Sequence, residues 1–138
     1  YPLNEDFLVN SIKALVFPST LKDWLYSMCE DAVNSKDPFV KENLNALLEE
    51  SLLSMRSFKF KNSLAPTVFT DSELASIKPP TLFLIGENET LYPAEKAVDR
   101  LNTAAPQLKT SIIKDAGHDI TLVQAKELNE KVFTFLGH

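Results

Sequence analysis

Two short segments of the sequence concentrate side chains that can handle protons. Residues 86–93 contain the carboxylates Glu87 and Glu89, and residues 114–119 contain His118, the only internal histidine. A carboxylate that accepts a hydrogen bond from an imidazole fixes its tautomer, and the other ring nitrogen can then take a proton from a nucleophile. The two segments therefore indicate the orienting acid and the general base of a nucleophilic triad.

Each of these segments follows a predicted strand. Residues 81–85 and 110–113 are compact apolar runs, separated by a helix that Pro93 opens and Pro106 closes, and a last amphipathic helix is predicted over residues 121–136. This alternation of strand and helix with short links is typical of parallel strands in an α/β sheet. Catalytic groups in such sheets lie beyond the carboxyl ends of the strands, so we expect the two segments to meet there.

Helices are predicted for the first part of the chain. Asn4 is expected to cap a helix over residues 4–16, and Ser19 or Thr20 to cap a second helix whose apolar side spans residues 21–32. Both stretches place apolar residues three and four positions apart, which favours amphipathic helices.

Capping residues mark two further helix starts. Asp37 followed by Pro38 is typical of an acidic cap with proline at the first helical position, and Thr70 with Glu73 has the form of a capping box that opens a short helix. Between these starts, alternation of phenylalanine with lysine favours an extended stretch over residues 57–66.

The sequence around the two strands resembles the α/β-hydrolase family. Residues 80–89, which read PTLFLIGENE, followed by Tyr92 and Pro93, are similar to the late strand and acid loop of that family. The sequence DAGH at residues 115–118, followed by an amphipathic helix, is similar to its histidine loop. In the family pattern the strand ends in glycine, and the triad acid stands three residues later.

This resemblance implies roles for individual residues. His118 would be the general base and Glu89 the triad acid, with glutamate in place of the commoner aspartate and with the family's order of acid before histidine. Glu87 stays open as an alternative acid. Asp115 and Asp119 flank the histidine, and a direct sequence neighbour seldom folds back onto a histidine ring. Asp119 is instead expected to cap the last helix.

The resemblance also implies a fold. It is of the α/β class, with a helical cap segment followed by the C-terminal β-α-β-α part of an α/β-hydrolase parallel sheet, so that the fold is incomplete. Residues 1–78 are predicted to form the cap or lid and its connector, and residues 79–138 the C-terminal part of the hydrolase core.

The family's nucleophile is absent from these residues. Its G-x-S-x-G elbow needs two glycines four positions apart, and the sequence has only Gly86, Gly117 and Gly137. We therefore expect part of a serine-type hydrolase for carboxylic esters or related small substrates, inactive as this chain alone. An aspartate nucleophile would give other chemistry on the same scaffold. The alternative is a non-catalytic binding or interaction protein that uses this scaffold.

Composition narrows the function classes further. A formal net charge of −5 with dispersed lysines and arginines argues against a nucleic-acid-binding protein, and no apolar run is long enough for a membrane span. A single cysteine, Cys29, favours a reducing, cytoplasmic setting, and we expect it to pack in a core. One cysteine and two histidines lack the spacing of a zinc site, so no metal is expected, and the resemblance implies no cofactor.

The predicted sheet also bears on partners. Two strands do not make a stable sheet by themselves, so one strand is expected to present an unpaired edge. That edge would pair with a missing N-terminal half or with a second copy of the chain. The expected substrate is a small, ester-like molecule.

Overall fold

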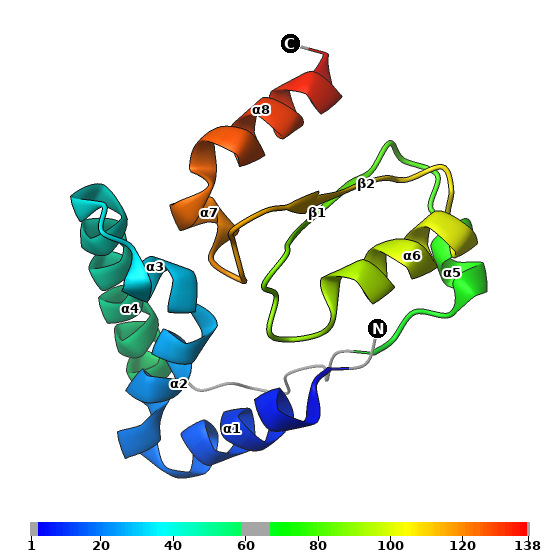
Figure 1. Cartoon of the computed structure of the whole chain (residues 1–138). Helices are drawn as coiled ribbons and strands as arrows, with labels where there is room; N and C mark the ends of the chain where they lie inside the picture. The colour runs from blue at the N-terminus through cyan, green and yellow to red at the C-terminus, as the bar shows by residue number, and fades with distance from the viewer. Residues whose placement is uncertain (1–2, 59–66, 138) are drawn as a thin grey trace.

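The structure, a computed structural model, describes residues 3–58 and 67–137. Its elements are, in chain order, α1 (Glu5–Val16), η1 (Pro18–Thr20), α2 (Leu21–Met28), α3 (Glu30–Asn34), α4 (Pro38–Ser57), α5 (Asp71–Ala75), β1 (Leu82–Gly86), α6 (Ala94–Ala104), β2 (Lys109–Ile113), α7 (Ile120–Val123) and α8 (Ala125–Leu136). Figure 1 shows β1 and β2 at the centre of the strand-containing segment (residues 67–137), with α1–α4 forming a helical segment (residues 3–58) to one side.

The two strands form a parallel pair, as the sequence predicts. Leu82 lies opposite Lys109, and the register continues to Gly86 opposite Ile113. Both strands therefore end at the same edge of the sheet, and the segments that follow them leave side by side. Within the described residues no third strand joins this sheet, so each strand keeps one unpaired edge.

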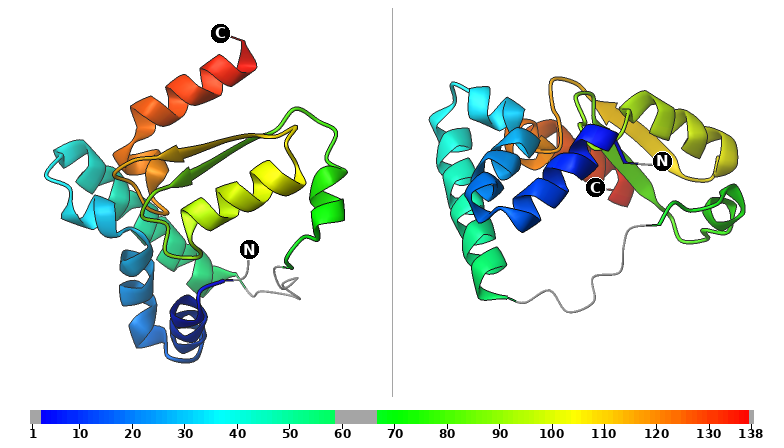
Figure 2. Two further views of the ribbon diagram at one scale, coloured as in Figure 1. Left: turned by 45° about the vertical axis from the view of Figure 1, so that its right-hand side comes forward. Right: turned by 90° about the horizontal axis from the view of Figure 1, so that it is seen from below.

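Helices cover both faces of this sheet. Ile85 is buried with Ala94 and Ala97 of α6, and Phe83 packs against the same cluster. Side chains of the opposite face border α8, where Phe135 lies near Leu82. Alternate residues of a strand point to opposite faces, so the apolar run of β1 supplies both layers. Figures 1 and 2 show α6 and α8 on opposite sides of the strands.

The helical segment has a core of its own. Its buried residues come from α1, α2, α3 and α4 and from the turn between α2 and α3; they are Ala14, Leu21, Leu25, Cys29, Ala32, Val40, Leu44 and Leu48. Leu122 and Val123 of α7 also pack against this core, so the helical segment is joined to the strand-containing segment beside the end of β2. The division at residues 78 and 79 stays a prediction.

Three of the predicted helix starts are confirmed. The side chains of Asn4 and Asp37 each accept the backbone N–H two residues further on, at 3.0 and 2.9 Å. Thr70 and Glu73 form a complete capping box at the start of α5. Each cap satisfies an N–H group that the helix itself leaves without an acceptor.

The second predicted helix is interrupted. Cys29 leaves the helical region with φ −115° and ψ 39°, which ends α2 at Met28 and lets α3 begin at Glu30. The predicted cap on Thr20 is wrong, because its hydroxyl donates to the carbonyl of Phe17 instead.

The last predicted helix is interrupted as well. Gln124, with φ −126° and ψ 35°, separates α7 from α8. The prediction that Asp119 caps this helix is wrong: its side chain makes no capping hydrogen bond and is buried against another part of the chain. A contact between residues far apart in sequence overrides the local pattern here.

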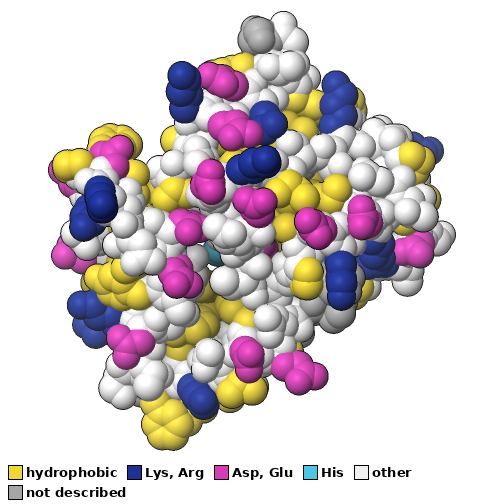
Figure 3. Space-filling model, in the orientation of Figure 1, with side chains coloured by type: hydrophobic (Ala, Val, Ile, Leu, Met, Phe, Trp, Pro, Cys, Tyr) yellow, Lys and Arg dark blue, Asp and Glu magenta, His cyan; other side chains and the backbone are white. Residues whose placement is uncertain are grey.

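Apolar side chains remain at the surface of the helical segment. Ile12 and Val16 of α1 are 60% and 61% exposed, and Figure 3 shows hydrophobic side chains at the lower edge of the molecule, where α1 lies.

The predicted extended stretch over residues 57–66 falls mostly outside the described residues, and Ser57 itself is the last residue of α4. Among residues 3–58 and 67–137, no helix combines the length and apolar character needed to cross a membrane.

Candidate active site

The segments that contain Glu89 and His118 meet at the carboxyl ends of β1 and β2. The N–H of Glu87 donates to the carbonyl of Ile113 at 2.8 Å, and the N–H of Asn88 donates to the carbonyl of Ala116 at 2.9 Å. The acid loop (residues 87–93) and the histidine loop (residues 114–119) thus continue the parallel pairing beyond the strands. These hydrogen bonds fix the position of one loop relative to the other along the strand direction.

Gly86 makes this close approach possible. A Cβ at this position would overlap the carbonyl oxygens of Ala116 and Gly117, which are backbone atoms that cannot rotate away. The histidine loop bends sharply just before this contact, where Asp115 has a positive φ of 52°. A glycine at the end of β1 is therefore required by the chain that crosses it.

His118 and Glu89 meet at the end of the sheet. His118 Nδ1 lies 3.0 Å from Glu89 Oε2, and Glu89 Oε1 accepts the backbone N–H of Leu91 at 3.0 Å. An ionised carboxylate can only accept hydrogen bonds, so Nδ1 carries the proton in this pair. In the neutral ring the other nitrogen, Nε2, is then unprotonated, and it makes no hydrogen bond with the described residues.

The two side chains differ in exposure. The Glu89 side chain is 8% exposed, whereas that of His118 is 45% exposed. The carboxylate therefore lies behind the imidazole ring, and the ring faces the solvent. This is the arrangement expected of an orienting acid and a base that must reach a reacting group.

Their electrostatics reinforce each other. The hydrogen bond to Glu89 raises the pKa of His118 above its ordinary 6.5, against the effect of burial, and the charges of Glu89 and Asp119 add to this rise. Burial would raise the pKa of Glu89, but hydrogen bonds from His118 and from the Leu91 N–H hold that pKa below its ordinary 4.5. Glu89 is thus kept ionised, and a protonated His118 is stabilised.

Glu87 has a different position. Its Oε2 accepts the N–H of Asp115 at 3.4 Å, so this carboxylate braces the turn after β2. Glu87 is exposed, and the structure pairs His118 with Glu89 and not with Glu87. Of the two carboxylates left open by the sequence, only Glu89 has the geometry of an orienting acid.

Helices of the other segment complete the surroundings of His118. A pocket of about 240 Å³ lies between α2, α3 and the two loops. Its lining residues are Ser27, Met28, Glu30, Asp31, Asn88, Thr90, Gly117 and His118. A small molecule in this pocket would contact both the helical segment and His118.

Known proteins that are similar to this chain include carboxylesterases. No protein-family model matches the chain. Carboxylesterase YbfK of Bacillus subtilis is 35% identical over 101 residues, which are 68% of this chain and 34% of YbfK. The crystal structure of that esterase, CesB (YbfK), matches 98% of this chain and 46% of its own, with a TM-score of 0.72 and 27% identity. The chain therefore has the fold of the C-terminal part of an α/β-hydrolase.

A second solved structure agrees. Naproxen esterase (carboxylesterase NP) from Bacillus subtilis matches 98% of this chain and 46% of its own, with a TM-score of 0.74 and 29% identity. The chain spans about half the length of these solved relatives and a third of the YbfK sequence. The predicted resemblance to the C-terminal half of an esterase-like α/β-hydrolase is confirmed.

One contact beside the candidate site was not predicted from the sequence. Asp119 is 4% exposed, and its Oδ2 accepts the N–H of Ala32 in α3 at 2.7 Å. Burial raises the pKa of Asp119, although the hydrogen bond from the Ala32 N–H acts in the opposite direction. Nothing in the local pattern points to residue 32, because 87 positions separate the two residues.

Cys29 does not join the candidate site. It is buried in the core of the helical segment, and burial followed by the charge of Asp119 raises the pKa of its thiol. A thiol that resists ionisation is a poor nucleophile, which fits the expected packing role.

Among the residues that the structure describes, no group of three or more histidine, cysteine or acidic side chains is placed to hold a metal ion.

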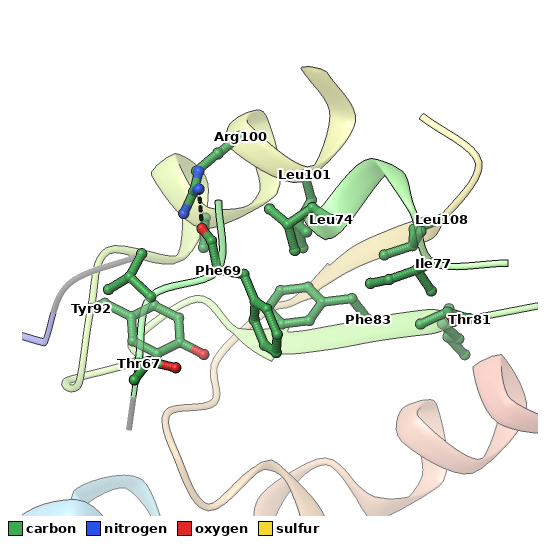
Figure 4. A pocket seen from close by; sticks show the side chains of 13 residues that line it. Thr67, Phe69, Leu74, Ile77, Thr81, Phe83, Tyr92, Arg100, Leu101 and Leu108 are labelled. Atoms are coloured by element: carbon green, nitrogen blue, oxygen red, sulfur yellow. Dashed lines mark hydrogen bonds between the residues drawn. The ribbon is translucent and has the colours of Figure 1, made fainter. Parts of the chain in front are cut away.

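A larger cavity of about 370 Å³ lies elsewhere, on the α6 face of the sheet. Mainly apolar side chains from α5, α6 and β1 line it, and Figure 4 shows Arg100 at its rim, bonded to the carbonyl of Phe69. Neither His118 nor Glu89 lines this cavity. His118 lines the pocket of about 240 Å³, with Glu89 behind its ring, so that pocket is the candidate active site.

Proposed function

We propose that the protein is a serine-type hydrolase of carboxylic esters or related small substrates. One observation carries the proposal: Nδ1 of His118 is held by Glu89 at 3.0 Å while Nε2 remains open. The similarity to carboxylesterases from Bacillus subtilis supports an ester as the substrate class. The adjoining pocket offers room for a small acyl or alcohol group.

His118 acts twice in the proposed reaction. Its Nε2 takes the hydroxyl proton as the nucleophile attacks the ester carbonyl, and the imidazolium then gives that proton to the leaving alcohol. A water molecule repeats the sequence to release the acid. Glu89 keeps its charge throughout, fixes the ring and stabilises the imidazolium, since hydrogen bonds already hold its pKa low.

The nucleophile and the oxyanion hole come from outside these 138 residues in this proposal. The sequence contains no G-x-S-x-G elbow, and its three glycines are too far apart for one. A base without a nucleophile does not complete an acyl transfer. Residues 1–138 alone are therefore expected to show no turnover of ester substrates.

Ester hydrolysis by the polypeptide of the complete reading frame tests the proposal. We expect turnover of p-nitrophenyl acetate and butyrate, and we expect His118→Ala to lower kcat by at least about a thousandfold. Thermal unfolding of both forms controls for loss of structure. Unchanged kcat in a folded His118→Ala variant would refute the catalytic role and favour the non-catalytic binding protein.

A further inference from the structure

Helix α3 contacts both loops of the candidate site. Asp31 Oδ2 accepts the Asn88 side-chain amide of the acid loop at 3.3 Å. The same Asp31 oxygen lies against Gly117 of the histidine loop, 3.2 Å from where a Cβ would stand. A five-residue helix of the helical segment thus touches the loop of the proposed acid and the loop of the proposed base.

Asp119 makes the buried part of this contact. Its Oδ2 accepts the Ala32 N–H at 2.7 Å, while its Oδ1 is buried without a partner among the described residues. Ala32 is the third residue of α3, where an N–H has no acceptor within the helix. The cap position of α3 holds Cys29, whose side chain makes no capping hydrogen bond. Asp119 supplies the missing acceptor from the histidine loop.

We propose that Asp119 is a positioning residue for His118, which fixes the histidine loop to α3 through the Ala32 N–H and so sets the reach of the ring. This inference rests on the proposed hydrolase function. Asp119 follows His118 directly, so a shift of its backbone moves the ring. Without that bond, the loop would keep its contacts with the acid loop, but toward the helical segment it would keep the contact of Gly117 with Asp31 and, through α7, the packing of Leu122 and Val123.

The charges near Asp119 determine what its removal does. The titratable groups that face Asp119 are Asp31 of α3, Cys29 in the turn before α3, and His118 in the histidine loop. Glu89 lies on the far side of the His118 ring. The charge of Asp119 contributes to the raised pKa of His118, and the hydrogen bond and charge of Glu89 also contribute. Asparagine keeps an oxygen for the Ala32 N–H and removes the charge, whereas alanine removes both.

Three variants of the polypeptide of the complete reading frame separate these roles. Asp119→Ala is expected to lower kcat by about tenfold to a hundredfold, with KM changed less than about threefold, because a displacement of about 1 Å is enough for such a loss. Asp119→Asn is expected to stay within about threefold of the wild-type kcat. Asp115→Asn, the matched control, removes an exposed carboxylate from the same loop and is expected to leave kcat unchanged.

The pH profile gives a readout that a purely structural role would not move. In Asp119→Asn the acid limb of kcat/KM is expected to shift to lower pH, because a charge that raises the pKa of His118 is gone. If Asp119→Ala does not fold, Asp119→Ser takes its place, because its shorter side chain weakens the bond to the Ala32 N–H. A fall in kcat of about tenfold or more then supports the proposal, and an unchanged kcat overturns it.

Two further results would overturn the inference. One is a folded Asp119→Ala variant with lower thermal stability and unchanged kcat, and the other is an Asp119→Asn variant as impaired as Asp119→Ala. His118→Ala separates this failure from that of the hydrolase proposal. Activity lost in His118→Ala and kept in Asp119→Ala overturns only the positioning role, whereas activity kept in His118→Ala overturns the proposed function.

Discussion

The two loops at the end of the sheet are held in different ways. In the acid loop, Glu89 is oriented by the N–H of Leu91, two residues further on. In the histidine loop, Asp119 is held by Ala32, which is 87 positions away in another segment. The acid is thus placed by its own loop, and the histidine is placed by packing between the two segments. Disturbing the helical segment should therefore affect His118 more than Glu89.

Glu89→Gln is the change expected to have the largest effect on the acid loop. An amide at this position can present an N–H to Nδ1, which favours the wrong tautomer of His118 and leaves Nε2 protonated. We expect kcat for p-nitrophenyl butyrate to fall by about 10³–10⁴-fold, by analogy with the loss of the orienting acid in serine proteases. Stopped-flow or steady-state assays of the polypeptide of the complete reading frame measure this. A folded variant with wild-type kcat would contradict the role of Glu89.

Gly86→Ala tests the contact between the loops themselves. The added methyl group meets backbone carbonyls of the histidine loop, so the chain must shift to admit it. We expect a loss of about 3 kcal/mol in the free energy of unfolding, at the upper end of the cost of overpacking. Urea denaturation measures this, with Gly137→Ala as a control: no atom lies near a Cβ there, although its φ of 83° adds some strain. Equal losses in the two variants would contradict the close approach at Gly86.

The stability contribution of the His118–Glu89 pair should depend on pH. The raised pKa of His118 means that its contribution is complete below the ordinary value of 6.5 and is lost as pH rises through the folded-state pKa. The lowered pKa of Glu89 means that its contribution is complete above 4.5 and is lost as pH falls through the folded-state pKa. The melting temperature of the wild type should exceed that of Glu89→Gln by the widest margin between pH 4.5 and 6.5. A difference that is constant from pH 5 to pH 9 would count against the ion pair.

Glu87→Gln is expected to have the smallest effect. Its carboxylate is exposed and accepts a long hydrogen bond from the N–H of Asp115, which glutamine can also accept. We expect kcat to change by less than about threefold and stability by less than about 0.5 kcal/mol. A loss of kcat as large as that of Glu89→Gln would exchange the assignments of the two carboxylates.

Local chemistry explains which features the sequence could predict. The parallel strands, the caps at Asn4 and Asp37 and the capping box at Thr70 depend on residues close together in the chain, and all are confirmed. The loops that hold Glu89 and His118 follow from strand order, because parallel strands end at one edge. The pairing of these residues could therefore be anticipated, whereas their catalytic role stays a proposal.

Tertiary contacts explain what the sequence could not predict. Apolar periodicity runs through Cys29 without a break, yet the helix is interrupted there and α3 takes its cap from Asp119. Asp119 stands where a helix cap would stand, which is why its local position indicated the wrong partner. The contact joins segments that share no sequence pattern, and only their packing reveals it.

His118 and Glu89 are proposed to work as one unit, and a double-mutant cycle is the sharpest test of this coupling. kcat is measured for the wild type, His118→Ala, Glu89→Gln and the double variant, all in the polypeptide of the complete reading frame. If Glu89 acts through His118, the double variant should match His118→Ala within about threefold, since an orienting acid has no effect without its base. Losses that multiply in the double variant would show that the two side chains act independently, and Glu89 would then not act through His118.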